Sequence, residues 1–335
     1  MKNNKFAIYM HKETFQANKD DVEYIGNNSA PHFNQIREKL SKIIEKYQEI
    51  PLYSVDFDEY KSIHSNEYIE KLKLLSRNIE TDYPRLSLEC ENFWHLIPGY
   101  KYSLGGLYSA IKMIKKNELN RTFCFSLPGH HAHPDWGHGY CLVNTQAAAA
   151  KYAQKLGYKN ILIIDWDFHH GDGTQDIFKN DDTVHTFSIH NYIDLYMSKM
   201  EVTHNGTTEY SKSIKEDTNI PILDSLFHDK FPEEVELKGN FYRANNNISI
   251  FKNTLNSLQF KPDMIFIFAG ADAHKDDLGE NVTEWDNDNF KELTKITLDF
   301  SKKNDCPVIS SPGGGYNQNV SVSVLKDHIE LMANY

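Results

Sequence analysis

Short apolar runs alternate with longer amphipathic segments along most of the chain. Six of the runs are brief, rich in β-branched or aromatic residues, and bounded by polar residues or by glycine and proline, as buried strands are. These runs are residues 6–10, 122–127, 160–165, 184–189, 264–270 and 307–311. Because most positions in each run are apolar, we expect both faces of the strands to be covered.

Helical periodicity fills several of the segments between these runs. Ile36, Leu40, Ile43 and Ile44 lie at the three- and four-residue spacing of one helix face. Asn144 is a suitable cap for a second helix, in which four consecutive alanines follow. The predicted helices are 33–48, 144–156 and 287–303. Strands that alternate with helices predict an α/β fold with a central, mostly parallel sheet flanked by helices.

Length and composition fit one large folded domain. The chain has 335 residues, of which 40% are apolar and 25% charged, and both values are ordinary for a globular protein. Length alone permits one domain or two. Since we find no linker, repeat or low-complexity block, we predict a single domain over residues 1–335.

The net charge of −11 argues against a nucleic-acid-binding surface, which would be basic. The four cysteines show no CxxC pair or regular spacing, so neither a disulfide framework nor a thiolate metal site is expected. They are Cys90, Cys124, Cys141 and Cys306. No apolar stretch is long enough for a signal-peptide core or a membrane span, and we expect a cytoplasmic protein.

The densest group of polar residues begins at the end of the run at 160–165. Three acids and two histidines fall within the eight residues 165–172. Asp167 and His169 are two residues apart, so on an extended chain they point to the same side and make a natural pair of metal ligands. Asp165 shares that side but lies deeper in the strand, which favours a buried supporting acid.

Asp272 follows the run at 264–270 in the same way as Asp167 follows its own strand. An acid at the end of a strand is ordinary when taken alone. Together with Asp167 and His169, however, Asp272 gives an oxygen, nitrogen and oxygen donor set with an open position, which is typical of catalytic zinc.

Two adjacent histidines, His130 and His131, follow the run at 122–127. Imidazole titrates near neutrality and therefore suits general acid and base work. Each ring needs a carboxylate to fix its tautomer, and Asp165 and Asp172 are the acids left over.

Three glycines and a tyrosine, Gly313–Gly315 and Tyr316, follow the run at 307–311. The glycines permit a close approach of the backbone to a bound group, and the Tyr316 hydroxyl suits donation to a developing oxyanion. All four groups follow predicted strands, and chemistry collects at the carboxyl edge of a parallel sheet.

Five segments carry a resemblance that covers the chain from about residue 120 to 320. They are PGHHA (128–132), GYCLVN (139–144), DWDFHHGDGTQDIF (165–178), GADAHKDD (270–277) and GGGYN (313–317). In order and spacing they resemble the motifs of the histone deacetylase superfamily, which includes the acetylpolyamine amidohydrolases. The resemblance implies a three-layer, arginase-like α/β fold. It also implies zinc-dependent hydrolysis of an N-acetyl amide to acetate and a free amine.

The resemblance assigns roles to individual residues. The implied zinc ligands are Asp167, His169 and Asp272. The implied catalytic groups are His131, oriented by Asp172 as general base and then acid, His130, paired with Asp165, and Tyr316, which polarises the acetyl carbonyl. Family members also bind potassium, here at the backbone of Asp165, Asp167 and His169 with Ser188 and Ile189, and peripherally at Phe178, Asp181 and Val184.

The substrate stays open between acetyllysine in a protein and an acetylated polyamine. The implied substrate contacts are Gly139, Tyr140, Gly314, Leu278 and Glu89, with Arg37 and Glu23 as further candidates at the rim. Leu278 stands where a polyamine-selective relative carries a gatekeeper glutamate, whereas stretches 23–26 and 206–210 resemble bacterial acetylpolyamine amidohydrolases. The long stretch 190–243 is a candidate for closing the tunnel of a second copy in a homo-oligomer.

Two alternatives differ in class from a zinc deacetylase. A binuclear manganese ureohydrolase of the same fold needs a second acid two residues after Asp272, where this chain has His274. A catalytically silent binding protein would have lost a ligand or the tyrosine, and this chain has lost neither.

Overall fold

The structure is a computed structural model of the chain, and it describes residues 5–17, 30–192, 217–226 and 241–335. Its centre is an eight-stranded sheet in the order β2-β1-β4-β10-β9-β6-β7-β8. Every neighbouring pair in this sheet is parallel, so the predicted α/β fold is confirmed. The strands are β1 Phe6–Tyr9, β2 Gln48–Glu49, β4 Arg121–Cys124, β6 Ile161–Asp165, β7 Val184–Asn191, β8 Asp217–Ile222, β9 Met264–Ala269 and β10 Val308–Pro312. A separate parallel pair joins β3 (Arg85–Leu86) to β5 (Trp136–Gly137).

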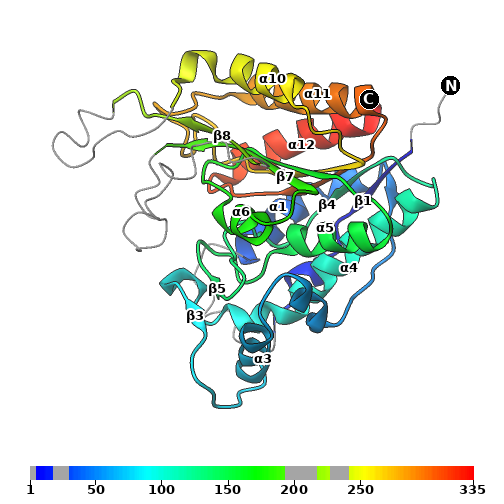
Figure 1. Cartoon of the computed structure of the whole chain (residues 1–335), viewed down its shortest axis with the longest axis vertical. Helices are drawn as coiled ribbons and strands as arrows, with labels where there is room; N and C mark the ends of the chain where they lie inside the picture. The colour runs from blue at the N-terminus through cyan, green and yellow to red at the C-terminus, as the bar shows by residue number, and fades with distance from the viewer. Residues whose placement is uncertain (1–4, 18–29, 193–216, 227–240) are drawn as a thin grey trace.

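Helices cover both faces of the sheet (Figure 1). The helices are α1 Ala30–Lys39, α2 Ser41–Ile44, α3 Asn66–Leu75, α4 Ile97–Lys115, α5 Thr145–Lys155, α6 Asp172–Phe178, α10 Asn247–Ser257, α11 Asn287–Asn304 and α12 Gln318–Asn334. In β6, Ile161 and Ile163 join the apolar cluster under α3, α4 and α5. Leu162 and Ile164 join the cluster under α1, α10, α11 and α12. Successive side chains thus feed opposite layers, as the pleat requires.

The predicted bounds hold for two helices and fail for the third, and the predicted cap of the helix at 144–156 is confirmed. The Asn144 side chain accepts a hydrogen bond from Ala147 N at the start of α5, and Asp286 forms a capping box with Asn289 at the start of α11. The helix predicted over 33–48 is instead broken between α1 and α2. The second of these helices, α2, ends at Ile44. The chain then extends, and Gln48 pairs with Ala7 of β1 instead of continuing the helix.

The sheet order brings the predicted site together. Strands β4, β10, β9 and β6 are consecutive neighbours, and each of the four polar groups follows one of these strands. Their carboxyl ends therefore meet at the same edge of the sheet, where parallel α/β folds place ligands. Within the described ranges, no helix combines the length and the apolar character that crossing a bilayer requires.

Candidate metal-dependent active site

Asp167, His169 and Asp272 converge at the carboxyl ends of β6 and β9. One potential ligand atom from each residue lies within 4.8 Å of the other two. His169 Nδ1 is 3.1 Å from Asp167 Oδ1 and 3.3 Å from Asp272 Oδ2. Asp272 is fully buried, and within the described part of the chain its Oδ2 makes no hydrogen bond. A buried, unsatisfied carboxylate oxygen beside a second carboxylate fits a cation site.

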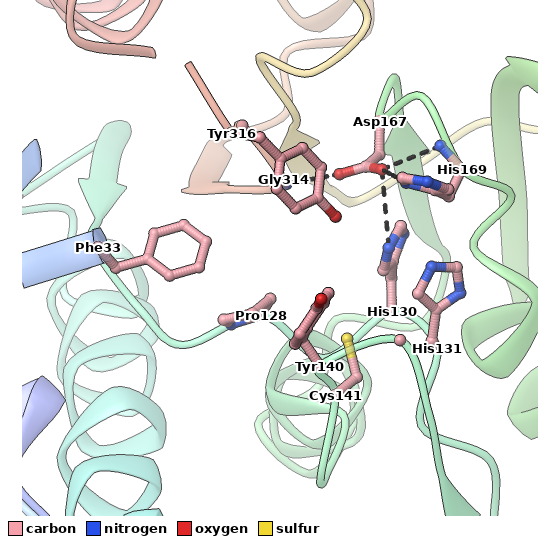
Figure 2. Close-up of a pocket in the computed structure, with 12 residues that line it drawn as sticks. Phe33, Pro128, His130, His131, Tyr140, Cys141, Asp167, His169, Gly314 and Tyr316 are labelled. Carbon is pink, nitrogen blue, oxygen red and sulfur yellow. Dashed lines mark hydrogen bonds and ion pairs between the residues drawn. The ribbon is translucent and has the colours of Figure 1, made fainter. Parts of the chain in front are cut away.

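Glycines keep the space around these ligands open. A Cβ at Gly314 would lie 2.4 Å from Asp272 Oδ2, and a Cβ at Gly270 would lie 2.7 Å from Asp167 Oδ2. Gly314 N donates a hydrogen bond of 2.6 Å to Asp167 Oδ2 and orients that carboxylate (Figure 2). The glycines of the two loops therefore act as spacers for the candidate metal centre.

Electrostatics also favour a cation here. Burial raises the pKa of the Asp272 carboxyl, and the neighbouring Asp167 charge raises it further. The pKa of Asp165 is raised for the same two reasons, burial first. Two carboxylate ligands and one imidazole match the donors that zinc prefers in catalytic sites, and iron or cobalt accept the same donors.

His130 and His131 each pair with a carboxylate through Nδ1. His130 Nδ1 is 2.9 Å from Asp165 Oδ2, and His131 Nδ1 is 2.8 Å from Asp172 Oδ1. Each carboxylate fixes the proton on Nδ1, so Nε2 is the basic nitrogen of each neutral ring. Burial and the neighbouring His130 lower the pKa of His131 to about 3, which keeps His131 neutral and able to accept a proton.

Tyr316 closes the pocket from the loop after β10. Its backbone N–H and that of Asn317 both donate to Asp277 Oδ2 at 2.8 Å, which holds the loop. The hydroxyl points into the pocket (Figure 2). Tyr316 as a whole residue is 41% exposed, but burial of the hydroxyl end and the charges of Asp272 and Asp167 raise the pKa of Tyr316 well above its usual value. Tyr316 therefore stays protonated and can donate a hydrogen bond.

The pocket between these groups is narrow, with a cavity volume of about 30 Å³. Gly139, with φ +53°, and Tyr140, with φ +63°, both line it in the left-handed region. A Cβ at Gly139 would lie only 2.4 Å from His131 Cδ2, so this position requires glycine on both counts. The other lining residues are Phe33, Pro128, Cys141 and Gly315. Gly315 belongs to the glycine run predicted at this site, whereas the first three were given no role from the sequence.

The residues predicted at the rim of the pocket lie farther apart than the metal ligands and the catalytic groups do. Leu278 is 38% exposed and donates its backbone N–H to Asp272 O. Glu89 follows the start of the 3-10 helix Leu88–Cys90, and both its carboxylate oxygens are buried without a hydrogen bond within the described ranges. Arg37 Nε instead donates to Asn34 on its own helix α1. Glu23, the stretches 23–26 and 206–210, and most of 190–243 lie outside the described residues.

The positions assigned to potassium form two predicted sites on three backbone segments, residues 165–169, 188–189 and 178–184. Asp165 and Ser188 are paired in register on the neighbouring strands β6 and β7, and the Ser188 hydroxyl is 2.7 Å from His190 Nδ1. Asp181 N donates to Phe178 O and Val184 N donates to Asp181 O, which makes one compact turn after α6.

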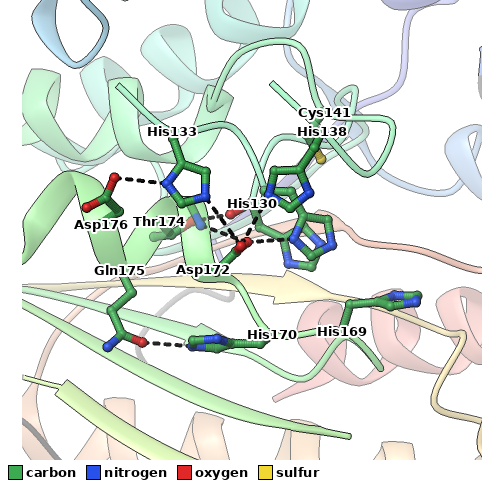
Figure 3. Close-up of polar contacts among 12 residues, drawn as sticks. His130, His133, His138, Cys141, His169, His170, Asp172, Thr174, Gln175 and Asp176 are labelled. Carbon is green, nitrogen blue, oxygen red and sulfur yellow. Dashed lines mark hydrogen bonds and ion pairs between the residues drawn. The ribbon is translucent and has the colours of Figure 1, made fainter. Parts of the chain in front are cut away.

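Two further histidines and an acid meet at Asp172, and no motif in the sequence indicated a role for them. His133 and His138 both reach Asp172 Oδ2, and Asp176 lies behind His133 (Figure 3). Asp176 stands four residues after Asp172, which is the spacing of one helix face. This spacing is the feature of the sequence that could have indicated that the two acids act on the same side of α6. His131, His138 and Asp172 also lie close enough together to hold a metal, but hydrogen bonds to Asp172 already join both rings to the carboxylate.

A family model described as "Histone deacetylase domain" matches residues 28–332. The chain belongs to the histone deacetylase family. Among curated relatives, a "Probable deacetylase" of Archaeoglobus fulgidus is 27% identical over 269 residues, which is 75% of this chain and 67% of that protein. The "Acetoin utilization protein AcuC" of Staphylococcus aureus is 28% identical over 303 residues, which is 85% of this chain and 72% of that protein.

Several family relatives are much longer than this chain. "Type-2 histone deacetylase 2" of Dictyostelium discoideum is 29% identical over 63% of this chain, but the match spans only 12% of that protein. Among solved structures, "Crystal Structure of HDA15 HD domain" superposes with a TM-score of 0.74 at 19% identity, covering 98% of this chain and 91% of that one. This likeness shows the fold of the histone deacetylase family.

Proposed function

We propose that this histone deacetylase family member hydrolyses N-acetyl amides to acetate and a free amine, using one zinc ion. The observation that carries the proposal is the convergence of three kinds of group in one pocket. These are the Asp167, His169 and Asp272 donor set, the His131–Asp172 pair, and the protonated Tyr316 hydroxyl.

Asp167, His169 and Asp272 would hold the zinc, because their donor atoms converge and Asp272 Oδ2 makes no hydrogen bond within the described residues. When bound, zinc supplies Lewis acidity, which polarises a carbonyl and makes a water more acidic.

The two histidines would manage the protons. Neutral His131 accepts a proton from the attacking water at Nε2, while Asp172 at Nδ1 stabilises the imidazolium that forms. Protonated His131 then returns the proton to the departing amine. The His130 ring is held by Asp165, and its Nε2 lies 3.8 Å from Asp167 Oδ1. A proton on His130 would offset part of the negative charge of Asp167.

Tyr316 would stabilise the tetrahedral oxyanion through its hydroxyl. The donor is held in place before reaction, because Asp277 anchors the loop, and such a fixed donor costs little reorganisation. Gly139 and Tyr140 would line the passage for the acyl-amine chain. We keep both acetyllysine in proteins and acetylated polyamines as substrates, and potassium as a structural ion at the two sites described above.

The ureohydrolase alternative gains no support from His274. Its Nδ1 accepts a hydrogen bond from Asp276 N at 3.0 Å, and its ring stacks on Phe290 at 6.0 Å. That nitrogen is therefore committed to the local turn and is a poor bridging ligand for a second metal.

Acetate release is the test of the proposed function. Zinc-loaded protein is incubated separately with an acetyllysine peptide and with N-acetylputrescine, and we expect acetate from at least one of them and none after chelation. We expect Asp272→Asn to reduce kcat/KM at least about a hundredfold, because a ligand carboxylate is lost. Absence of acetate from both substrates with folded, zinc-loaded protein would contradict the proposal.

Asp276→Asn is the matched control for this variant. It makes the same chemical change four residues along the chain, at a side chain that is 67% exposed. We expect wild-type zinc content and activity from it. Equal losses in the two variants would show that the effect does not arise at the metal site.

A further inference from the structure

A second and much larger cavity lies at the amino ends of β4, β6, β9 and β10, at the edge of the sheet opposite the candidate metal centre. Its volume is about 1240 Å³. The last turns of α4, α11 and α12 and the loops that lead into the four strands form its walls. The proposed deacetylation uses none of these residues, so the cavity needs an explanation of its own.

Positive charge gathers around this cavity, although the chain as a whole has a net charge of −11. Among the described residues, five basic side chains and two acidic ones line it. Positive charges still outnumber negative ones if a terminal carboxylate at Tyr335 is added to the acids. The cavity is therefore a locally basic part of an acidic protein. The basic residues are Lys115, Arg121, Lys159, Lys261 and Lys302, and the acidic residues are Asp263 and Asp305.

The lysines of the cavity are not neutralised by acids. Within the described ranges, none of the four forms an ion pair. Lys115 Nζ lies 5.2 Å from the centre of the Tyr158 ring, and Lys302 Nζ lies 5.6 Å from the centre of the Tyr335 ring. These cation–π contacts hold the ammonium groups at the wall of the cavity but leave their charge uncompensated.

Helix capping does not account for these lysines. Cations are favourable at the C-terminal ends of helices, and α4 and α11 both end at this cavity. However, the last carbonyl groups of α11 already accept hydrogen bonds from backbone N–H groups, from Asp305 to Lys302 O and from Cys306 to Ser301 O. The backbone of residues 116–118 does the same at the end of α4. The ammonium groups are thus not needed to satisfy these helix ends.

Hydrogen bonds fasten two of the basic loops to each other. Asp263 Oδ2 accepts from Lys159 N at 2.8 Å and from Asn160 N at 2.9 Å. Asn160 Nδ2 donates to Lys261 O at 3.1 Å. Because the Asp263 carboxylate is occupied by backbone groups, it fixes the loops that carry Lys159 and Lys261 on neighbouring strands β6 and β9.

The start of β4 adds two further polar groups to the wall. Arg121 Nε donates to Met332 O at 2.7 Å, which fixes the guanidinium beside the end of α12. Asn120 Oδ1 is buried and makes no hydrogen bond within the described residues. Guanidinium and ammonium groups bind phosphate oxygens, and the Asn120 oxygen can accept a hydrogen bond from a hydroxyl group of the same ligand.

We propose that this cavity binds a small organic polyphosphate, which is a ligand with at least two adjacent phosphate groups. The five basic side chains stand on five different segments, and a single phosphate ion is too small to contact most of them. Cavities of roughly 300–1,000 Å³ already hold drug-sized ligands, so the volume suffices for a larger anion. A nucleic acid is a poor occupant, because the acidic remainder of the chain would repel it.

Calorimetric titration of the full chain with ATP and, separately, with tripolyphosphate tests the proposal. We expect one ligand per chain. Lys115→Gln/Lys302→Gln should weaken binding at least about tenfold, because each variant side chain loses a charge-assisted contact. Tighter binding of ATP would show that the nucleoside contributes, and otherwise the phosphates alone are recognised. A Kd above about 1 mM for both ligands would overturn the proposal.

Lys116→Gln/Lys303→Gln is the matched control. These lysines follow Lys115 and Lys302 directly but do not line the cavity, and their loss changes the net charge by the same amount. We expect wild-type affinity from this variant. Both double variants keep the candidate metal centre, so contact of a phosphate with a metal there would affect them equally. Equal affinities in the two double variants would overturn the proposal, whether or not the chain deacetylates anything.

Discussion

Tyr316→Phe lowers kcat for acetate release by about a hundredfold to a thousandfold and leaves KM nearly unchanged, which is the expected result of removing one oxyanion donor. The variant keeps the ring, so its contacts with His169 and Tyr140 persist. Only the hydroxyl is lost. The raised pKa of Tyr316 means that this hydroxyl is protonated across the working pH range, and the loss should therefore be nearly independent of pH. Steady-state kinetics on both candidate substrates measures it.

Tyr152→Phe is the matched control for this prediction. Tyr152 lies on α5 and stacks on Tyr108 at 3.7 Å, away from the pocket residues. We expect its activity to equal that of the wild type. If Tyr316→Phe lost less than about tenfold in kcat, the oxyanion role of Tyr316 would have to be abandoned.

A second large effect is a steep loss of stability in acid, from pH 6.5 down to about pH 4. Burial lowers the pKa of His64 and His185 to about 4 and that of His328 to about 3, and it lowers that of His190 strongly. His64 Nε2 accepts a hydrogen bond from Asn144 N, which only the neutral ring can do. In the unfolded chain all four rings take up protons near pH 6.5.

The direction in which stability changes with pH follows from proton uptake by the two states. Below pH 6.5 the unfolded state binds more protons than the folded state, so stability falls as the pH falls and is fully present above pH 6.5. Each ring contributes at most about 1.4 kcal/mol per pH unit, and the four rings together contribute about 5.6 kcal/mol per pH unit. A loss on the order of 10 kcal/mol by pH 4 equals the whole stability of a typical domain. Urea unfolding at a series of pH values measures the slope.

His328 offers the variant for this test. Its two ring nitrogens contact Thr294 Oγ1 and Ser310 Oγ at 2.8 and 2.9 Å. His328→Asn removes the titrating ring, so the slope between pH 6.5 and 4.5 should fall by about 1.4 kcal/mol per pH unit even if the variant is less stable at pH 7. An unfolding free energy that stays flat over this range in the wild-type chain would contradict the account.

The four groups at the site could be predicted because each is continuous in sequence and follows an apolar run. The short distances among Asp167, His169 and Asp272 require only that β6 and β9 be neighbours, and strand-end rules favour that outcome. The His133, His138 and Asp176 contacts could not be predicted in this way. They depend on how the turn around β5 folds back over α6, and no periodicity in the sequence reports that packing.

Helix α4 and strand β8 show where local patterns mislead. The α4 sequence carries Pro98 in its first turn, where proline suits a helix start, but Gly105–Gly106 in its middle argue against a helix. The structure explains the two glycines, because a Cβ at Gly105 would lie 2.0 Å from Tyr53 O and a Cβ at Gly106 would lie 2.3 Å from the Tyr9 ring. Close packing requires glycine there. Strand β8 was not predicted, because Pro221 and several polar residues break the apolar pattern that identifies a strand. Such residues are tolerated there because β8 lies at the edge of the sheet.

The most direct test of the central claim is a titration of metal-free protein with zinc, in which acetate release from the preferred substrate is followed at each step. The account predicts that activity rises linearly and stops rising at one zinc per chain, the number that Asp167, His169 and Asp272 can hold together. Activity that needs two metal ions per chain, or that does not depend on metal at all, would contradict it.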